Sequence, residues 1–105
     1  MTEKSRFDRN GYAPSILGNS DYCAVCFRRD RPLQRHEVFH GAFRSKSKRL
    51  GLWVSLCDEC HREVHQSDGK LDRRLKEWAQ RHAMTVYNWT EADFRKEFGK
   101  NYLEV

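Results

Sequence analysis

The chain has 105 residues, the size of one small domain, and a formal net charge of +5. Because 38% of its residues are apolar and 33% are charged, one hydrophobic core barely suffices, and we expect a structural metal or an oligomer to supplement it. No apolar run approaches the roughly 20 residues that span a bilayer, and the N-terminus lacks the apolar stretch of a signal peptide. We therefore expect a cytoplasmic protein without a membrane segment, whose positive charge favours a polyanionic partner.

The first 20 residues are polar and show no sustained hydrophobic period. Gly11, Pro14 and Gly18 interrupt this segment and disfavour a long regular element. We predict that residues 1–20 form a flexible arm ahead of the folded part, which would then occupy residues 21–66 with a helical extension at 67–105.

Two short strands are predicted in the folded part. Residues 33–39 follow a turn-prone run, and residues 52–56 carry β-branched and aromatic side chains that are typical of a buried strand. The segment between them, residues 41–51, is bounded by glycines, is rich in Lys and Arg and lacks a clean apolar face. We predict a loop there.

Helices are predicted after the second strand. Residues 58–65 contain no helix breaker, and from about Lys70 to His82 apolar side chains recur at helical spacing. Residues 85–87 should form a short extended link. Thr90 should then cap a last helix that packs back on the core. The residues expected to be buried in these two helices are Leu71, Leu75, Trp78, Ala79, Phe94 and Phe98.

Four cysteines occur as two Cys-x-x-Cys pairs. This gap lets both thiolates of a pair reach one tetrahedral zinc ion at about 2.3 Å. In a reducing cytoplasm such pairs are thiolate ligands more often than disulfides. We predict one structural zinc ion shared by Cys23, Cys26, Cys57 and Cys60.

Histidines predict a second metal site. His61 and His65 are four residues apart, so on a helix they project from one face and can grip one ion, with His36 on the facing strand as a third ligand. Four thiolates already fill one zinc ion, so the histidines imply a second ion with open positions. An alternative joins Cys57 or Cys60 to His61 and His65 at one mixed site without a reactive metal. His40 is expected to be an ordinary polar residue, and His82 is expected to pack on the later helix.

We call the two Cys-x-x-Cys pairs the first knuckle (Cys23 and Cys26) and the second knuckle (Cys57 and Cys60). With these knuckles, a histidine on a strand and histidines on a helix, the chain resembles the HNH endonucleases, whose ββα-metal core has two strands and one helix around a catalytic ion. More narrowly, four segments look like short HNH proteins of bacteriophages related to the recombinase-dependent phage nucleases: His36 to Gly41 (HEVFHG), Lys46-Ser47, Gly51 to Cys57 (GLWVSLC) and Phe98 to Leu103 (FGKNYL). The resemblance implies a small α+β fold, with an HNH-like core at residues 21–66 stapled by the zinc knuckle pair and followed by C-terminal helices.

The resemblance also implies roles. A strand histidine of that family acts as general base, and helix histidines hold the ion. Carried over, His61 and His65 are ligands of the catalytic ion. His36 is the base, or, if His36 is a ligand, Glu37 occupies the base position. Phe43 stands where a phage-type relative often has the asparagine that orients the base.

The implied function is a metal-dependent DNA endonuclease or nickase that acts on double-stranded DNA and leaves a 5′-phosphate. It would use structural Zn²⁺ and a second divalent ion such as Mg²⁺, Mn²⁺, Ni²⁺ or Zn²⁺. The alternative is a non-catalytic, zinc-dependent DNA- or protein-binding module of degenerate HNH type. A homodimer, or a phage or host recombination or packaging protein as partner, is compatible with either, in the host cytoplasm if the chain is phage-encoded. The cations expected to contact the DNA backbone are Arg35, Arg44, Lys46, Lys48 and Arg49.

Overall fold

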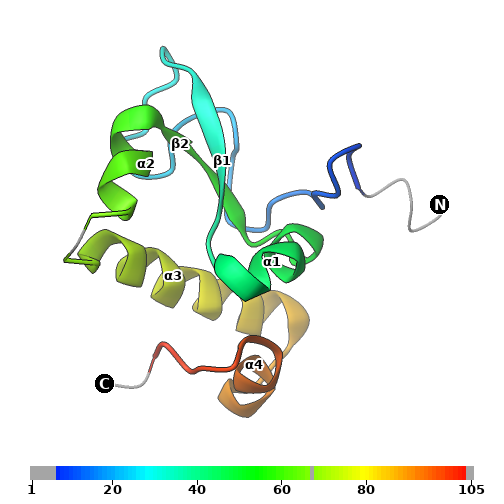
Figure 1. The fold of residues 1–105 in the computed structure, drawn as a ribbon. Coiled ribbons are helices and arrows are strands. Elements are labelled where there is room, and N and C mark those ends of the chain that lie inside the picture. The colour runs from blue at the N-terminus through cyan, green and yellow to red at the C-terminus, as the bar shows by residue number, and fades with distance from the viewer. Residues whose placement is uncertain (1–6, 67, 104–105) are drawn as a thin grey trace.

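The computed structural model describes residues 7–66 and 68–103. Within these residues the chain forms two strands, four α-helices and one short 3₁₀ helix (Figure 1). In chain order they are β1 (Leu33–Glu37), η2 (Gly41–Phe43), α1 (Arg44–Leu50), β2 (Trp53–Cys57), α2 (Asp58–Val64), α3 (Lys70–Tyr87) and α4 (Glu91–Phe98). The small α+β class is thus confirmed. None of the helices in this part of the chain is long and apolar enough to cross a membrane.

The two strands form an antiparallel pair in which Leu33 lies opposite Cys57 and Glu37 opposite Trp53. Successive side chains of a strand point to opposite faces of the sheet. One face of the pair therefore looks toward α2, which packs on both strands, and the other looks toward the segment that precedes the first knuckle. In Figure 1, α3 runs below this hairpin and α2 stands beside it.

The core joins the hairpin to the C-terminal helices through aromatic rings. Phe39 lies two residues after the end of β1, and its ring centre is 5.3 Å from that of Phe94 and 4.6 Å from that of Phe98. Burial of each such side chain contributes roughly 1.5–3 kcal/mol. Thr90 and Asp93 form the predicted cap of α4, since each side chain accepts a hydrogen bond from the other's backbone N–H. The prediction that α4 buries Phe94 and Phe98 is confirmed.

The loop predicted at residues 41–51 is wrong, because η2 and α1 occupy it. Ser47 holds α1 in place: its hydroxyl accepts a hydrogen bond from Phe39 N and donates one to Phe39 O. Gly51 ends α1 in the left-handed region at φ 73°. A Cβ at Gly51 would collide with the backbone oxygen of Pro14, so this position needs glycine for both reasons.

The extended link predicted at residues 85–87 is also wrong, since α3 continues to Tyr87. Packing overrides the weaker helix propensity of the β-branched residues there. Ala83 is fully buried, and the Tyr87 hydroxyl donates a 2.6 Å hydrogen bond to Leu50 O. Asn88, in the left-handed conformation, ends the helix with its N–H bonded to Met84 O.

Much of the segment predicted as an arm packs on the hairpin. Ala13 and Leu17 are buried, the Trp53 indole N–H donates a 2.8 Å hydrogen bond to Ala13 O, and Ile16 N donates to Gly51 O at 2.9 Å. These backbone contacts cover the face of the sheet that α2 leaves open, so residues 7–20 belong to the folded unit. Residues 1–6 of the predicted arm lie outside the described residues.

Candidate metal centres

The four cysteines meet where β2 passes into α2. Each offers a sulfur within 4.8 Å of the other three, so the group can hold one metal ion. Cys23, Cys57 and Cys60 are buried, whereas Cys26 is exposed at the edge of the cluster. The predicted four-cysteine set is therefore brought together as a cluster compatible with a structural zinc ion.

The first knuckle is closed by its own backbone. Phe27 N donates to Cys23 O and Cys23 N to Arg28 O, both at 2.8 Å, while Cys26 N lies 3.5 Å from Cys23 Sγ. Phe27 adopts φ 66°, a left-handed conformation that is uncommon outside glycine, to complete the turn. The turn thus directs a backbone N–H group at sulfur from within the knuckle itself.

The surroundings of the cysteines shift their pKa values in different directions. Burial opposes ionisation of Cys23, but backbone N–H groups, led by that of Cys26 and then that of Cys57, lower the pKa of Cys23 to about 6. Burial and the neighbouring thiols raise the pKa of Cys60 above its ordinary value. Four thiolates cannot share this space without a cation, so metal binding must release protons here.

The second cluster consists of His36, His61 and His65. One ring nitrogen of each lies within 4.8 Å of those of the other two. His36 comes from β1, while His61 and His65 lie one turn apart at α2 and its C-terminal end. The ring centres of His36 and His61 are 5.4 Å apart, those of His36 and His65 5.6 Å, and those of His61 and His65 5.1 Å. Strand alternation and the i,i+4 helix spacing produce this convergence.

His36 has the environment of a metal ligand. The residue is 3% exposed, and its Nε2 is a buried side-chain nitrogen without a hydrogen-bond partner among the described residues. A buried polar atom without a partner costs about 1–3 kcal/mol, and an ion between the three rings would satisfy it. Burial, and then the neighbouring histidines, lower the pKa of His36 to about 4, which favours the neutral imidazole that metals bind.

Gln34 on β1 contacts His61 of the histidine cluster. It lies two residues before His36 on β1, hence on the same face, and its side-chain oxygen is hydrogen-bonded to His61 Nδ1. The bond requires that Nδ1 carry the proton and leaves Nε2 of His61 free for a metal. Gln34 was not among the residues predicted from the sequence, although its spacing from His36 was a signal that could have identified it.

His40 and Asp72 form a further pair that was not predicted from the sequence. His40 Nε2 lies 3.2 Å from Asp72 Oδ1, and Asp72 Oδ2 lies 2.8 Å from Lys76 Nζ. Burial opposes ionisation of Asp72, but Lys76 and His40 outweigh it and lower the pKa of its carboxyl. The His40 ring centre is 5.9 Å from that of His36 and 6.0 Å from that of His65, so this pair borders the histidine cluster.

Glu37 lies away from the histidine cluster. It follows His36 directly on β1 and so points to the other face, where it accepts a 2.6 Å hydrogen bond from the Tyr12 hydroxyl and lies 3.0 Å from Arg44 Nε. The structure does not bring Glu37 together with the histidines as a base would require.

The cations predicted to contact DNA have different surroundings. Arg35 pairs with Asp8 at 2.6 Å and stacks on Tyr12, on the same face as Glu37. Lys46 lies 3.2 Å from the Glu97 carboxylate and donates to Glu97 O, which ties α1 to α4. The remaining members lie on α1: Arg44 is next to Glu37, Lys48 is half-buried over the Tyr12 ring, and Arg49 is exposed.

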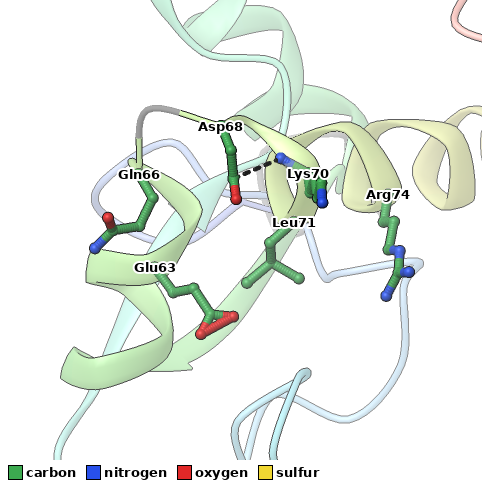
Figure 2. A pocket seen from close by; sticks show the side chains of 6 residues that line it. All are labelled: Glu63, Gln66, Asp68, Lys70, Leu71 and Arg74. Carbon is green, nitrogen blue, oxygen red and sulfur yellow. Dashed lines mark hydrogen bonds between the residues drawn. The ribbon is translucent and has the colours of Figure 1, made fainter.

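A hollow of about 290 Å³ lies between the end of α2 and the start of α3 (Figure 2). It is lined by Glu63, Gln66, Asp68, Lys70, Leu71 and Arg74. These side chains carry charges of both signs, and neither cluster contributes to the lining. The hollow is therefore separate from both candidate metal centres.

The described residues thus define a small α+β protein with a cysteine cluster that can hold a structural metal and a neighbouring histidine cluster that can hold a second ion. No protein-family model, curated protein or solved structure matches the chain.

Proposed function

We propose that the chain is a metal-dependent DNA endonuclease or nickase of HNH type. The observation that carries this proposal is the convergence of His36, His61 and His65, one ring nitrogen each within 4.8 Å, with His36 Nε2 lacking a hydrogen-bond partner in the described part of the chain. The chain order supports the proposal, because β1, β2 and α2 follow one another as strand, strand and helix, with η2 and α1 between the strands, as the resemblance to the ββα-metal core leads us to expect.

Three protein ligands suit catalysis better than structure, because a three-ligand site keeps positions open for water and substrate. An ion there would act as a Lewis acid toward a phosphodiester and stabilise the departing sugar oxygen. Imidazole ligands suit zinc, nickel and related ions, whereas magnesium prefers oxygen ligands. The donor set therefore favours a transition metal, with Gln34 orienting His61.

DNA is the proposed substrate because of charge. The net charge of +5 favours a polyanion, and α1 carries the half-buried Lys48 and the exposed Arg49. Cations of this kind contribute affinity for the phosphate backbone without reading sequence.

One observation favours the rival function, a non-catalytic zinc module. Phe43, at the position where the resemblance leads one to look for an orienting asparagine, is half-buried with its ring centre 5.7 Å from that of Phe98. An aromatic side chain packed in this way cannot hold a base by an amide hydrogen bond. In the rival reading the chain binds one zinc ion and DNA or protein without cleaving.

The test is incubation of supercoiled plasmid with the zinc-loaded protein and magnesium, manganese, nickel or zinc in turn. We expect nicking or linearisation that requires a second divalent ion and is lost in His36→Ala and His65→Ala. His82→Ala is the matched control, because His82 packs on Trp78 of α3, outside both clusters. A folded, zinc-loaded parent that is inert with all four ions would leave the binding module as the better reading.

A further inference from the structure

The proposed nuclease needs a group that takes a proton from the attacking water. A catalytic base must reach that water and later return the proton to solvent. Glu37 is engaged with Tyr12 and Arg44 on the other face of the sheet. His36 is 3% exposed, with Nε2 enclosed in the ligand cluster. Both sequence-based candidates for the base are thus occupied in other ways.

His40 meets the requirements that these residues do not. It follows β1 at the edge of the histidine cluster, with its ring centre 5.9 Å from that of His36 and 6.0 Å from that of His65. Its side chain is 38% exposed, so a substrate and bulk water can reach the ring. These ring-centre distances place His40 beside the space between the three ligands, where a water can connect the ring to that space.

Asp72 gives this ring a defined orientation. Asp72 Oδ1 lies 3.2 Å from His40 Nε2, and because a carboxylate only accepts hydrogen bonds, Nε2 is the donor and Nδ1 is the ring nitrogen that can accept a proton. Lys76 lies 2.8 Å from the other oxygen of Asp72 and is itself 16% exposed, which fixes the carboxylate from the far side. The arrangement combines a base with a carboxylate that orients it, as in catalytic triads.

We propose that His40 is the proton acceptor of the cleavage reaction and that Asp72 is its positioning residue, an inference that rests on the proposed nuclease function. The water oxygen forms a bond to phosphorus while the bond from phosphorus to the 3′ sugar oxygen breaks. The water proton passes to Nδ1 of His40, and the departing oxygen takes a proton from solvent. Asp72 stabilises the imidazolium that forms, as a carboxylate partner does in general.

The experiment measures single-turnover plasmid cleavage by zinc-loaded variants together with their content of the second ion. His40→Ala should keep both ions and the thermal unfolding midpoint but cut at least roughly 100-fold more slowly, the usual contribution of a base. Added imidazole should restore part of the His40→Ala rate and none of the His65→Ala rate. His40→Gln, which retains a polar side chain, serves as a second variant and should be equally slow.

Asp72 is tested by readouts that a purely structural role would leave unchanged. Asp72→Asn should lower kcat with little change in KM, and Asp72→Glu should recover part of the rate, whereas His82→Ala, outside both clusters, should leave the rate unchanged. If the parent cuts DNA and His40→Ala cuts it equally well, the inference about His40 is wrong, but the proposed nuclease function is not contradicted. The same holds if His40→Ala loses the second ion. A parent that does not cut overturns both.

Discussion

The Tyr12 hydroxyl donates a 2.6 Å hydrogen bond to Glu37 across the face of the sheet that is turned away from the histidines. The partners are 25 residues apart, and the same carboxylate lies 3.0 Å from Arg44 Nε. The bond therefore fastens the segment before the first knuckle to both β1 and α1. It also explains why Glu37, polar and next to His36, is buried without serving the metal centre.

Tyr12→Phe should lower the free energy of unfolding by about 1.5 kcal/mol, the low end for a hydrogen bond to a charged group. Tyr22→Phe is the matched control, since Tyr22 packs on Phe27 through its ring, and it should change stability by less than about 0.5 kcal/mol. Urea unfolding of the zinc-loaded proteins at pH 7 measures both. Equal effects of the two substitutions would show that the bond to Glu37 contributes nothing.

The same bond predicts a pH dependence. Burial, followed by the bond to Glu37, raises the pKa of Tyr12 from 10.0 to about 12. A group with a raised folded-state pKa stabilises the protein below its unfolded-state pKa, and this contribution is lost as the pH rises through the folded-state pKa. The stability gap between parent and Tyr12→Phe should therefore close between about pH 10 and 12. A gap that stays constant over that range would contradict the assignment.

Cys26→Ser should abolish zinc binding and leave a poorly folded chain. Structural zinc contributes about 10–16 kcal/mol in small knuckle peptides, more than most small domains have in total. Zinc content by atomic absorption and thermal unfolding by circular dichroism test the claim. Arg28→Ser, an exposed change beside the knuckle, should keep both properties. A Cys26→Ser protein with unaltered zinc and unfolding would remove the structural role of the cluster.

Gln34→Ala should lower the affinity for the second ion about 10- to 100-fold, as loss of an orienting partner of a metal-bound histidine commonly does. Isothermal titration of the zinc-loaded protein with nickel measures the change. Arg35→Ala is the control, because its side chain stacks on Tyr12 on the opposite face. If Gln34→Ala binds nickel as tightly as the parent, the hydrogen bond to His61 does not serve an ion.

Neutralising Lys48 and Arg49 together should flatten the salt dependence of DNA binding. Each lost phosphate contact should reduce the slope of log affinity against log salt by about 1. Lys46→Gln should instead lower stability by up to about 1 kcal/mol and leave that slope unchanged, because Lys46 contacts Glu97. A double variant with the parent slope would mean that this side of α1 does not contact DNA.

The sequence predicted those site residues that are only a few positions apart in the chain. The two Cys-x-x-Cys gaps and the His61/His65 interval fix geometry over a single turn, and the strand pattern placed His36 opposite α2. Asp72 carries no such signal, because it meets His40 from 32 residues away. The distance along the chain hides the pair, since only the packing of α3 under the hairpin creates it.

Helix α1 was not predicted for the same reason: the contacts that hold it in place join residues that are not near neighbours in the chain. Its sequence has no apolar stripe, and it is anchored by Ser47 on Phe39 and by the approach of Gly51 to Pro14. Neither contact is a periodic pattern. The arm prediction was misled in a similar way, because residues 7–20 are polar on average while Ala13 and Leu17 are buried.

Cys60 and His61 are consecutive residues, yet they belong to different clusters. A zinc ion at the cysteines would fix the first turn of α2 and with it the direction of His61. Under the proposed function the two ions are then thermodynamically linked, and each must raise the affinity for the other by the same factor. In a cell, the supply of one metal would thereby govern a reaction carried out at another.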